Sequence, residues 1–141
     1  MKFLFSFLLS ISFQLSFAQT TNDWVLFHAE NGVSFYKLEA DCQPTNIPNQ
    51  IGILIKIVNK NKQEITATWD LRLWYDNKEF TSNIADKENQ LTVVIPKNEE
   101  ILGNCDTPFG NLYILKRFTT FNNSATLTDF KFDNIRITIN K

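Results

Sequence analysis

The sequence predicts an all-β protein, an antiparallel β-sandwich of about seven or eight strands. Apolar and polar residues alternate over several short stretches, whereas no long stretch repeats with the helical period of 3.6 residues. Turn-forming residues separate these stretches. The chain has 141 residues, a length that suits a single domain.

The N-terminal segment predicts a signal peptide. Lys2 supplies the positive start, an apolar run follows, and Ser16-Phe17-Ala18 places small residues where a signal peptidase reads the chain. An uncleaved membrane anchor is the alternative, but serine and glutamine dilute the run, and a span needs roughly 20 apolar residues. We therefore expect residues 1–18 to be removed and residues 19–141 to form one exported domain, periplasmic or secreted, without a membrane span.

The first part of this domain predicts a tight hairpin and then a change of sheet. Asn31-Gly32 lies between β-prone runs at about 23–29 and 33–40, and both residues suit a type I′ turn, which needs positive φ at its two central positions. The segment DCQPTNIPNQ then predicts a connection between sheets, because proline lacks the N–H that a strand ladder needs. Residues 51–58 follow as an apolar strand.

Residues 64–75, EITATWDLRLWY, show the clearest alternation in the chain. Trp69 shares one face with isoleucine, alanine and leucine side chains, so it is predicted to point into the core. Trp74 is five positions further along and shares the opposite face with Asp70 and Arg72. It is therefore predicted to point outward.

The rest of the domain predicts further strands joined by polar loops. The last of them changes the parity of its apolar positions between Phe132 and Ile135, so a bulge near Asp133-Asn134 is needed to keep one apolar face. The predicted elements are a short edge strand within 78–84, a strand at 91–95, a long loop at 97–111, a strand at 112–118 and a final strand at 127–140.

Two stretches carry a resemblance to a known group of proteins. ILIKIVNKNKQEITATWDLRLWYDNK and LTVVIPKNEEILGNC resemble bacterial exported immunoglobulin-like and fibronectin-III-like β-sandwiches, in which a strand ending in asparagine precedes a long strand. The resemblance covers about half of the chain and implies an immunoglobulin-like fold without implying an activity. Immunoglobulin domains place a tyrosine two residues before the second cysteine, where this chain has Gly103.

The two cysteines, Cys42 and Cys105, predict one disulfide. Cysteines that occur as an even pair in an exported chain usually bond, and with two of them the connectivity is fixed. A catalytic thiol pair would be closely spaced, as in C-x-x-C. Both cysteines fall in predicted loops, so we expect the bond to clamp strand ends and not to cross the core.

The sequence predicts no catalytic residue, metal ligand or cofactor site. His28 is the one histidine, and no serine lies in a Gly-x-Ser-x-Gly elbow. The sequence therefore does not support a Ser-His-Asp catalytic triad. The acidic pairs Glu99-Glu100 and Asp86/Glu88 lie in predicted loops, where we expect them to be solvated surface residues. Asx-rich turns around Asp76 and Asp106 leave a calcium site open as an alternative to ordinary turn chemistry. A net charge of −1 without a basic patch argues against nucleic acid.

An aromatic surface is the remaining candidate for a binding site. Trp74 forms a platform only if other rings stand beside it, and Arg72 is placed to stack on it or to pair with Asp70. The alternative is a Trp74 that the 78–84 segment covers. The candidate ligand-binding residues are Trp74, Arg72, Tyr113, Phe80 and Phe109.

These observations favour a small exported, non-enzymatic β-sandwich that binds or scaffolds at the cell envelope, with an envelope protein or a glycan as its partner. Two alternatives remain: a glycan-active hydrolase that uses loop carboxylates, and a subunit of the strand-donating or adhesin type.

Overall fold

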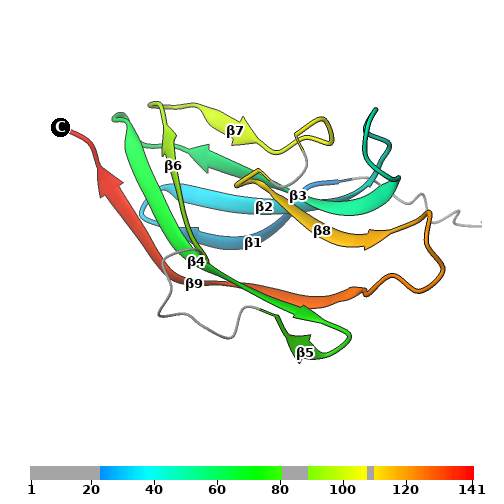
Figure 1. The fold of residues 1–141 in the computed structure, drawn as a ribbon. Coiled ribbons are helices and arrows are strands. Elements are labelled where there is room, and N and C mark those ends of the chain that lie inside the picture. Colours follow the sequence, from blue (N-terminus) through cyan, green and yellow to red (C-terminus); the bar gives the residue numbers. More distant parts are fainter. Residues whose placement is uncertain (1–22, 81–88, 108–109) are drawn as a thin grey trace, which may run out of the picture.

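The computed structural model describes residues 23–80, 89–107 and 110–141, and within them nine strands form two antiparallel sheets packed face to face. The protein is an all-β sandwich, as the sequence predicts. Figure 1 shows the two layers, with β3 and β8 in one and β4 and β9 in the other. Within the described residues there is no helix long and apolar enough to cross a membrane.

The first sheet is built around β3. The hairpin strand β2 pairs with β3 over its whole length, and β1 pairs with β2 on the far side. The other edge of β3 is shared, because β7 pairs with its second half and β8 with its first half. The strands of this sheet are β1 (Val25–Glu30), β2 (Val33–Cys42), β3 (Gln50–Asn59), β7 (Glu100–Leu102) and β8 (Tyr113–Phe118).

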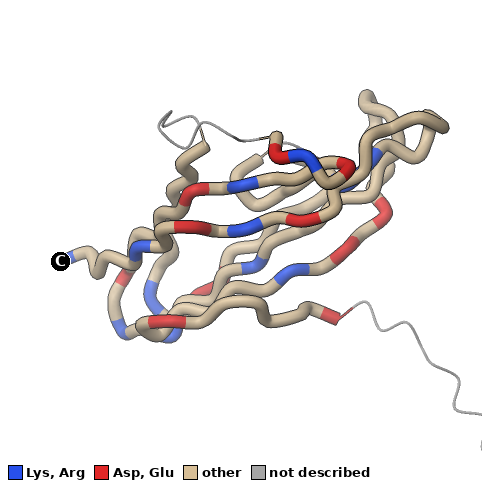
Figure 2. Tube along the Cα trace, turned by 90° about the horizontal axis from the view of Figure 1, so that it is seen from below, with Lys and Arg blue, Asp and Glu red and all other residues tan. Residues whose placement is uncertain are grey.

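The second sheet is built around β4. The long C-terminal strand β9 pairs with one edge of β4 from end to end, whereas β6 and β5 share the other edge. The strands of this sheet are β4 (Ile65–Tyr75), β5 (Lys78–Glu79), β6 (Gln90–Ile95) and β9 (Leu127–Ile139). Figure 2 shows charges of both signs interspersed along neighbouring strands, without gathering by sign.

Two local features confirm the turn and bulge predictions. Asn31 and Gly32 have φ values of 47° and 74°, which is the left-handed pair that a type I′ hairpin needs. In β9 the register against β4 shifts between Thr68 and Asp70, and Asn134 has a φ of 52°. This bulge keeps Phe130, Phe132, Ile135 and Ile137 packed against the core, as the parity change predicted.

Two element predictions were wrong. The predicted loop at 97–111 contains β7, a strand of three residues whose Ile101 pairs with Ile57. Three residues are too short to show an alternating pattern, so the sequence could not reveal it. Cys42 was placed in a loop but is the last residue of β2. Of the predicted edge strand, Lys78–Glu79 forms β5, and its later residues lie outside the described part of the chain.

The densest part of the core surrounds Trp69. Its side chain is fully buried, stacks on Phe132 with ring centroids 5.0 Å apart, and meets the edge of Phe35 at 6.0 Å. Ile55 and Ile57 of β3 and Ile65 and Ile95 of the second sheet are also fully buried. The inward facing of Trp69 is thus confirmed.

The end of the sandwich beside this core is closed by Asn59, which is 1% exposed. Its side-chain nitrogen lies 2.9 Å from Gln63 O, 3.1 Å from Ile95 O and 2.9 Å from Pro96 O. Its side-chain oxygen accepts a hydrogen bond from Asn61 N at 2.9 Å. One buried amide therefore fixes the β3–β4 turn and ties the first sheet to β6 of the second.

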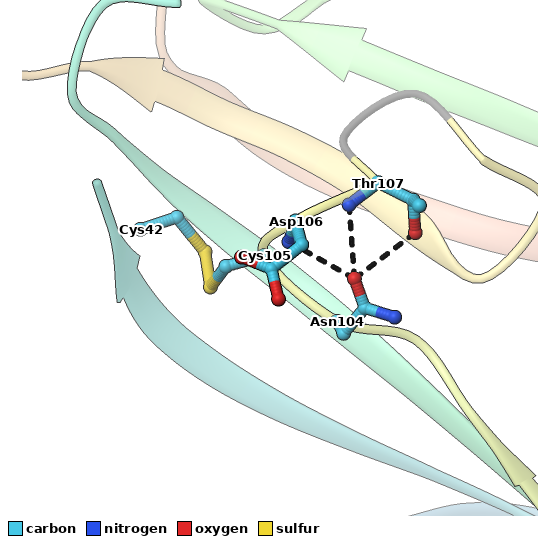
Figure 3. The surroundings of a disulfide bond; sticks show 5 residues. All are labelled: Cys42, Asn104, Cys105, Asp106 and Thr107. Atoms are coloured by element: carbon cyan, nitrogen blue, oxygen red, sulfur yellow. Dashed lines mark hydrogen bonds between the residues drawn. A yellow bond between two sulfur atoms is a disulfide. The ribbon is translucent and has the colours of Figure 1, made fainter. Parts of the chain in front are cut away.

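The predicted disulfide between Cys42 and Cys105 is formed, with the two Cα atoms 5.2 Å apart (Figure 3). It joins the end of β2 to the β7–β8 connection, so it clamps a strand end on the outer face of the first sheet. Cys42 is fully buried there with Leu54 and Tyr113. Such a bond is compatible with an oxidising environment.

Replacement of Trp69 by alanine should destabilise the protein by about 3–5 kcal/mol, because a fully buried ring leaves a cavity that the neighbouring rings cannot fill. Trp74→Ala is the matched control and should cost about 1–2 kcal/mol, since it removes contacts with two cations at a partly exposed site. Urea denaturation measures both. Equal losses would contradict the assignment of the two rings to core and surface.

Reduction of the disulfide should lower the free energy of unfolding by about 4 kcal/mol, because the bond closes a loop with a sequence separation of 63. Urea denaturation with and without reductant measures this loss. Thiol titration of the unfolded, unreduced protein should find no free thiol. Two reactive thiols, or an unchanged denaturation midpoint, would refute the prediction.

Candidate functional site

An apolar pocket of about 840 Å³ lies between the second half of β4 and β8. We call it the open-end pocket. Its volume is in the range of natural small-molecule sites, roughly 300–1,000 Å³. The described lining residues are Leu71, Leu73, Tyr75, Phe80, Leu91, Gly110, Asn111, Tyr113, Ile114, Leu115, Phe118, Phe121, Asn123, Ser124 and Ala125.

The pocket arises because the inner face of β4 is filled at one end only. Ile65, Ala67 and Trp69 are fully buried, but Leu71 and Leu73 on the same face are only half-buried. The strand of the first sheet that faces Leu71 and Leu73 is β8, and Figure 1 shows β8 lying over the second half of β4. Apolar side chains placed for a core are thus left beside an open space.

One hydrogen bond ties the two sheets at this pocket. The Tyr75 hydroxyl donates to Leu115 O at 2.5 Å, across from β4 to β8. Burial raises the pKa of Tyr75 above its usual value, and burial followed by the nearby Tyr75 raises the pKa of Tyr113 to about 12. Both phenols are therefore protonated at neutral pH, and Tyr75 keeps the proton that it donates.

Exposed rings stand beside the pocket opening. Phe80 is 74% exposed and meets the edge of the Tyr75 ring at 5.8 Å. Phe121 is 55% exposed and meets the edge of Phe118 at 5.9 Å. Large exposed hydrophobic side chains that border a concave apolar surface mark binding sites more often than scattered single ones do.

The polar atoms in the lining are few and largely committed. Ser124 Oγ accepts from Phe118 N at 3.0 Å and donates to Ala125 O at 3.3 Å. Asn111 Nδ2 contacts Thr92 O at 3.4 Å. None of the described lining residues is charged, so this part of the pocket offers no counter-ion to a charged ligand.

The predicted aromatic platform does not assemble around Trp74. Trp74 lies on the outer face of the second sheet, where Arg72 stacks on it at 5.0 Å and Lys131 lies 5.6 Å from the ring centroid. Arg72 pairs with Glu79 at 2.6 Å and Asp133 at 3.4 Å, whereas pairing with Asp70 had been the expected alternative. The hydrogen bond to Glu79 is the main cause of a raised pKa for Arg72.

The other predicted site residues lie elsewhere. Phe80 borders the open-end pocket and contacts Tyr75, which is on the opposite side of the sheet from Trp74. Tyr113 is 5% exposed and packs over Gly52, where a Cβ atom would lie 2.3 Å from its ring. Phe109 lies outside the described residues. The structure therefore separates Trp74 and Arg72 from Phe80 and Tyr113, and only the latter two line the pocket.

The described residues form no metal-binding cluster. No group of three or more His, Cys, Asp or Glu side chains in that part of the chain is placed to hold a metal ion. The Asx-rich turns use their side chains locally: Asn104 Oδ1 accepts from Asp106 N and Thr107 N at 2.9 Å each (Figure 3). His28 is partly exposed on β1 and lies 3.6 Å from Glu30.

Comparison with known proteins gives no family for the chain. No protein-family model matches it, and neither a curated protein nor a solved structure is significantly similar to it. The candidate site therefore has to be argued from its own geometry.

Several pocket residues were missed at the level of sequence. Leu71 and Leu73 were correctly placed on the inner face but were expected to be ordinary core. Phe118 and Phe121 stand out in the sequence only as two phenylalanines close to a predicted strand end, which does not indicate a pocket. The face of a strand can be read from alternation, but what lies opposite that face cannot.

Tyr75→Phe should lower the free energy of unfolding by about 1 kcal/mol, because it removes one donor and leaves Leu115 O without the phenol. It should also increase hydrogen exchange in β8 more than in β2, since the lost bond anchors β8 to β4. Tyr36→Phe, on the outer face of the first sheet, is the control. Equal effects of the two substitutions on β8 would contradict this role.

Proposed function

We propose that the protein is a small exported, non-enzymatic binding module of the cell envelope, and that the open-end pocket is its ligand site. The observation that carries this proposal is the pocket itself, about 840 Å³ of apolar space bordered by exposed phenylalanine rings. A domain that only scaffolds gains nothing from leaving this surface open to water, because burial of apolar area stabilises a fold.

Export is the second part of the proposal. It is supported by the form of the N-terminal segment and by the Cys42–Cys105 bond, which an oxidising compartment would maintain. The non-enzymatic reading is supported by the pocket chemistry. The described lining has no carboxylate, histidine, lysine or cysteine, and the hydroxyl groups of Tyr75 and Ser124 are bonded to the chain. Burial raises the pKa of the third hydroxyl group, that of Tyr113.

The alternatives have less support. A glycoside hydrolase needs two carboxyl groups facing each other across a sugar. Of the loop acids expected to serve, Glu99 and Glu100 are solvent-exposed outside the pocket, and Asp86 and Glu88 lie outside the described residues. A strand-donating subunit needs an unprotected edge. The long edge strand β9 carries Lys131, Arg136 and the bulge at Asn134, features by which sheets discourage pairing with other chains.

Affinity capture from envelope extract tests the proposal. The protein, produced from its full chain, should retain a protein, glycan or lipid that the double variant Phe80→Ser/Phe121→Ser loses by tenfold or more. Both residues are highly exposed, so the variant should fold normally. Val94→Ser is the matched control, because Val94 is also exposed but lies outside the pocket.

Two results would overturn the proposed function. One is capture that the pocket variant and the control retain equally, since the site would then lie elsewhere. The other is turnover in a hydrolase screen that substitution of Glu99 and Glu100 abolishes, since the protein would then be an enzyme.

A further inference from the structure

The wall of the open-end pocket is long as well as apolar. β4 contributes three alternate side chains to it, Leu71, Leu73 and Tyr75. At a rise of about 3.4 Å per residue these span about 14 Å along the strand. Leu91 of the neighbouring β6 and Ile114 of β8 add aliphatic surface on either side. A slot of this form suits a linear apolar body.

Few polar atoms of the described lining are available to a ligand, and this restricts the class of ligand further. A peptide that entered the slot would bring an N–H and a C=O at every residue, and each would need a partner once buried. The Tyr75 hydroxyl is bonded to Leu115 O, and Ser124 Oγ is bonded to the chain in both directions. The Tyr113 ring is buried against Gly52. The described lining therefore suits a chain that carries no polar groups along its length.

The same lining indicates where a charged group of the ligand would lie. Because no described lining residue is charged, an ionic group has no charged partner among them and is more stable in water. At the polar part of the lining stand Asn111 and Asn123, both exposed amides. These neutral groups do not select the sign of a head group.

We propose that the open-end pocket binds a single aliphatic acyl chain, with the head group held outside in water. This inference rests on the proposed function and names its ligand class. The chain would lie against Leu71, Leu73 and Ile114, with the exposed rings of Phe80 and Phe121 covering it near the opening. Two sources provide this chemistry, a free long-chain acid and a lipid of a bilayer.

The test is direct binding of defined amphiphiles to the purified full-chain protein, each kept below its aggregation concentration. Dodecanoate should bind, and removal of two methylenes should raise the dissociation constant about tenfold. Dodecyltrimethylammonium should bind within a few-fold of dodecanoate despite its opposite charge. Neutral phosphatidylcholine vesicles form the second arm, so recruitment to them identifies a bilayer lipid as the source, and binding of the free acid alone identifies a soluble one.

Ala125→Trp is the blocking variant. Ala125 lines the pocket but is exposed in a loop, so a large side chain there should occupy the space without disturbing a strand. It should weaken acyl binding at least tenfold, as should Phe80→Ser/Phe121→Ser, whereas Val94→Ser should not. Unchanged denaturation midpoints confirm that the variants are folded.

Two results would overturn the acyl assignment. One is the absence of acyl binding in both arms, and the other is binding that Ala125→Trp leaves unchanged. If an extended peptide of alternating leucine and serine binds instead and Ala125→Trp blocks it, the ligand is a protein segment. In that case the acyl assignment fails while the proposed binding function stands, so the two failures are distinguishable.

Discussion

The buried amide of Asn59 sets the geometry on which the rest of the sandwich depends. It lies at the end of β3, where one side chain contacts Gln63 O, Ile95 O and Pro96 O. Ile95 is the last residue of β6 and Pro96 follows it, so the amide joins the first sheet to the second. The hydrogen bond to Ile95 O is buried, so loss of the amide would leave that carbonyl without a partner in the interior, which is costly. Asn59 thereby fixes where β4 begins relative to β3 of the first sheet.

Once the start of β4 is fixed, the alternation of its side chains decides what the two ends of the sandwich become. The first three inward residues meet β3 and close the core around Trp69. The last three extend beneath β8, which borders the open-end pocket at this end, and the two sheets are tied there by Tyr75 and Leu115. The pocket is therefore not a defect in packing. It is the space that remains between two points at which the sheets are held.

Much of this fold could be predicted from the sequence, because its main determinants are local. The Asn31-Gly32 turn, the inward Trp69 and the bulge at Asn134 each follow from a few adjacent residues. The pairing of Cys42 with Cys105 followed from their number alone.

The candidate site could not be predicted, because it depends on contacts between residues far apart in the chain. Tyr75 and Leu115 meet across the sheets although 40 positions separate them, and no local pattern encodes that contact. Phe80 was expected beside Trp74, yet it follows a tight turn at Asp76 and Asn77 that sends it to the other side of the sheet. Tyr113 was expected to be available, but Gly52 leaves room for its ring to lie flat and buried.

The principal constraints on the fold, which are the Trp69 core, the Asn59 amide and the disulfide, lie outside the lining of the open-end pocket. Exposed phenylalanine at 80 and 121 costs apolar burial that a more compact arrangement would recover. A fold that is stabilised elsewhere can keep such surface exposed, and a ligand that covers it would then gain free energy that the fold itself has left unused. This contrast between a well-buried core and an apolar surface open to water supports the proposal that the protein is a binding module.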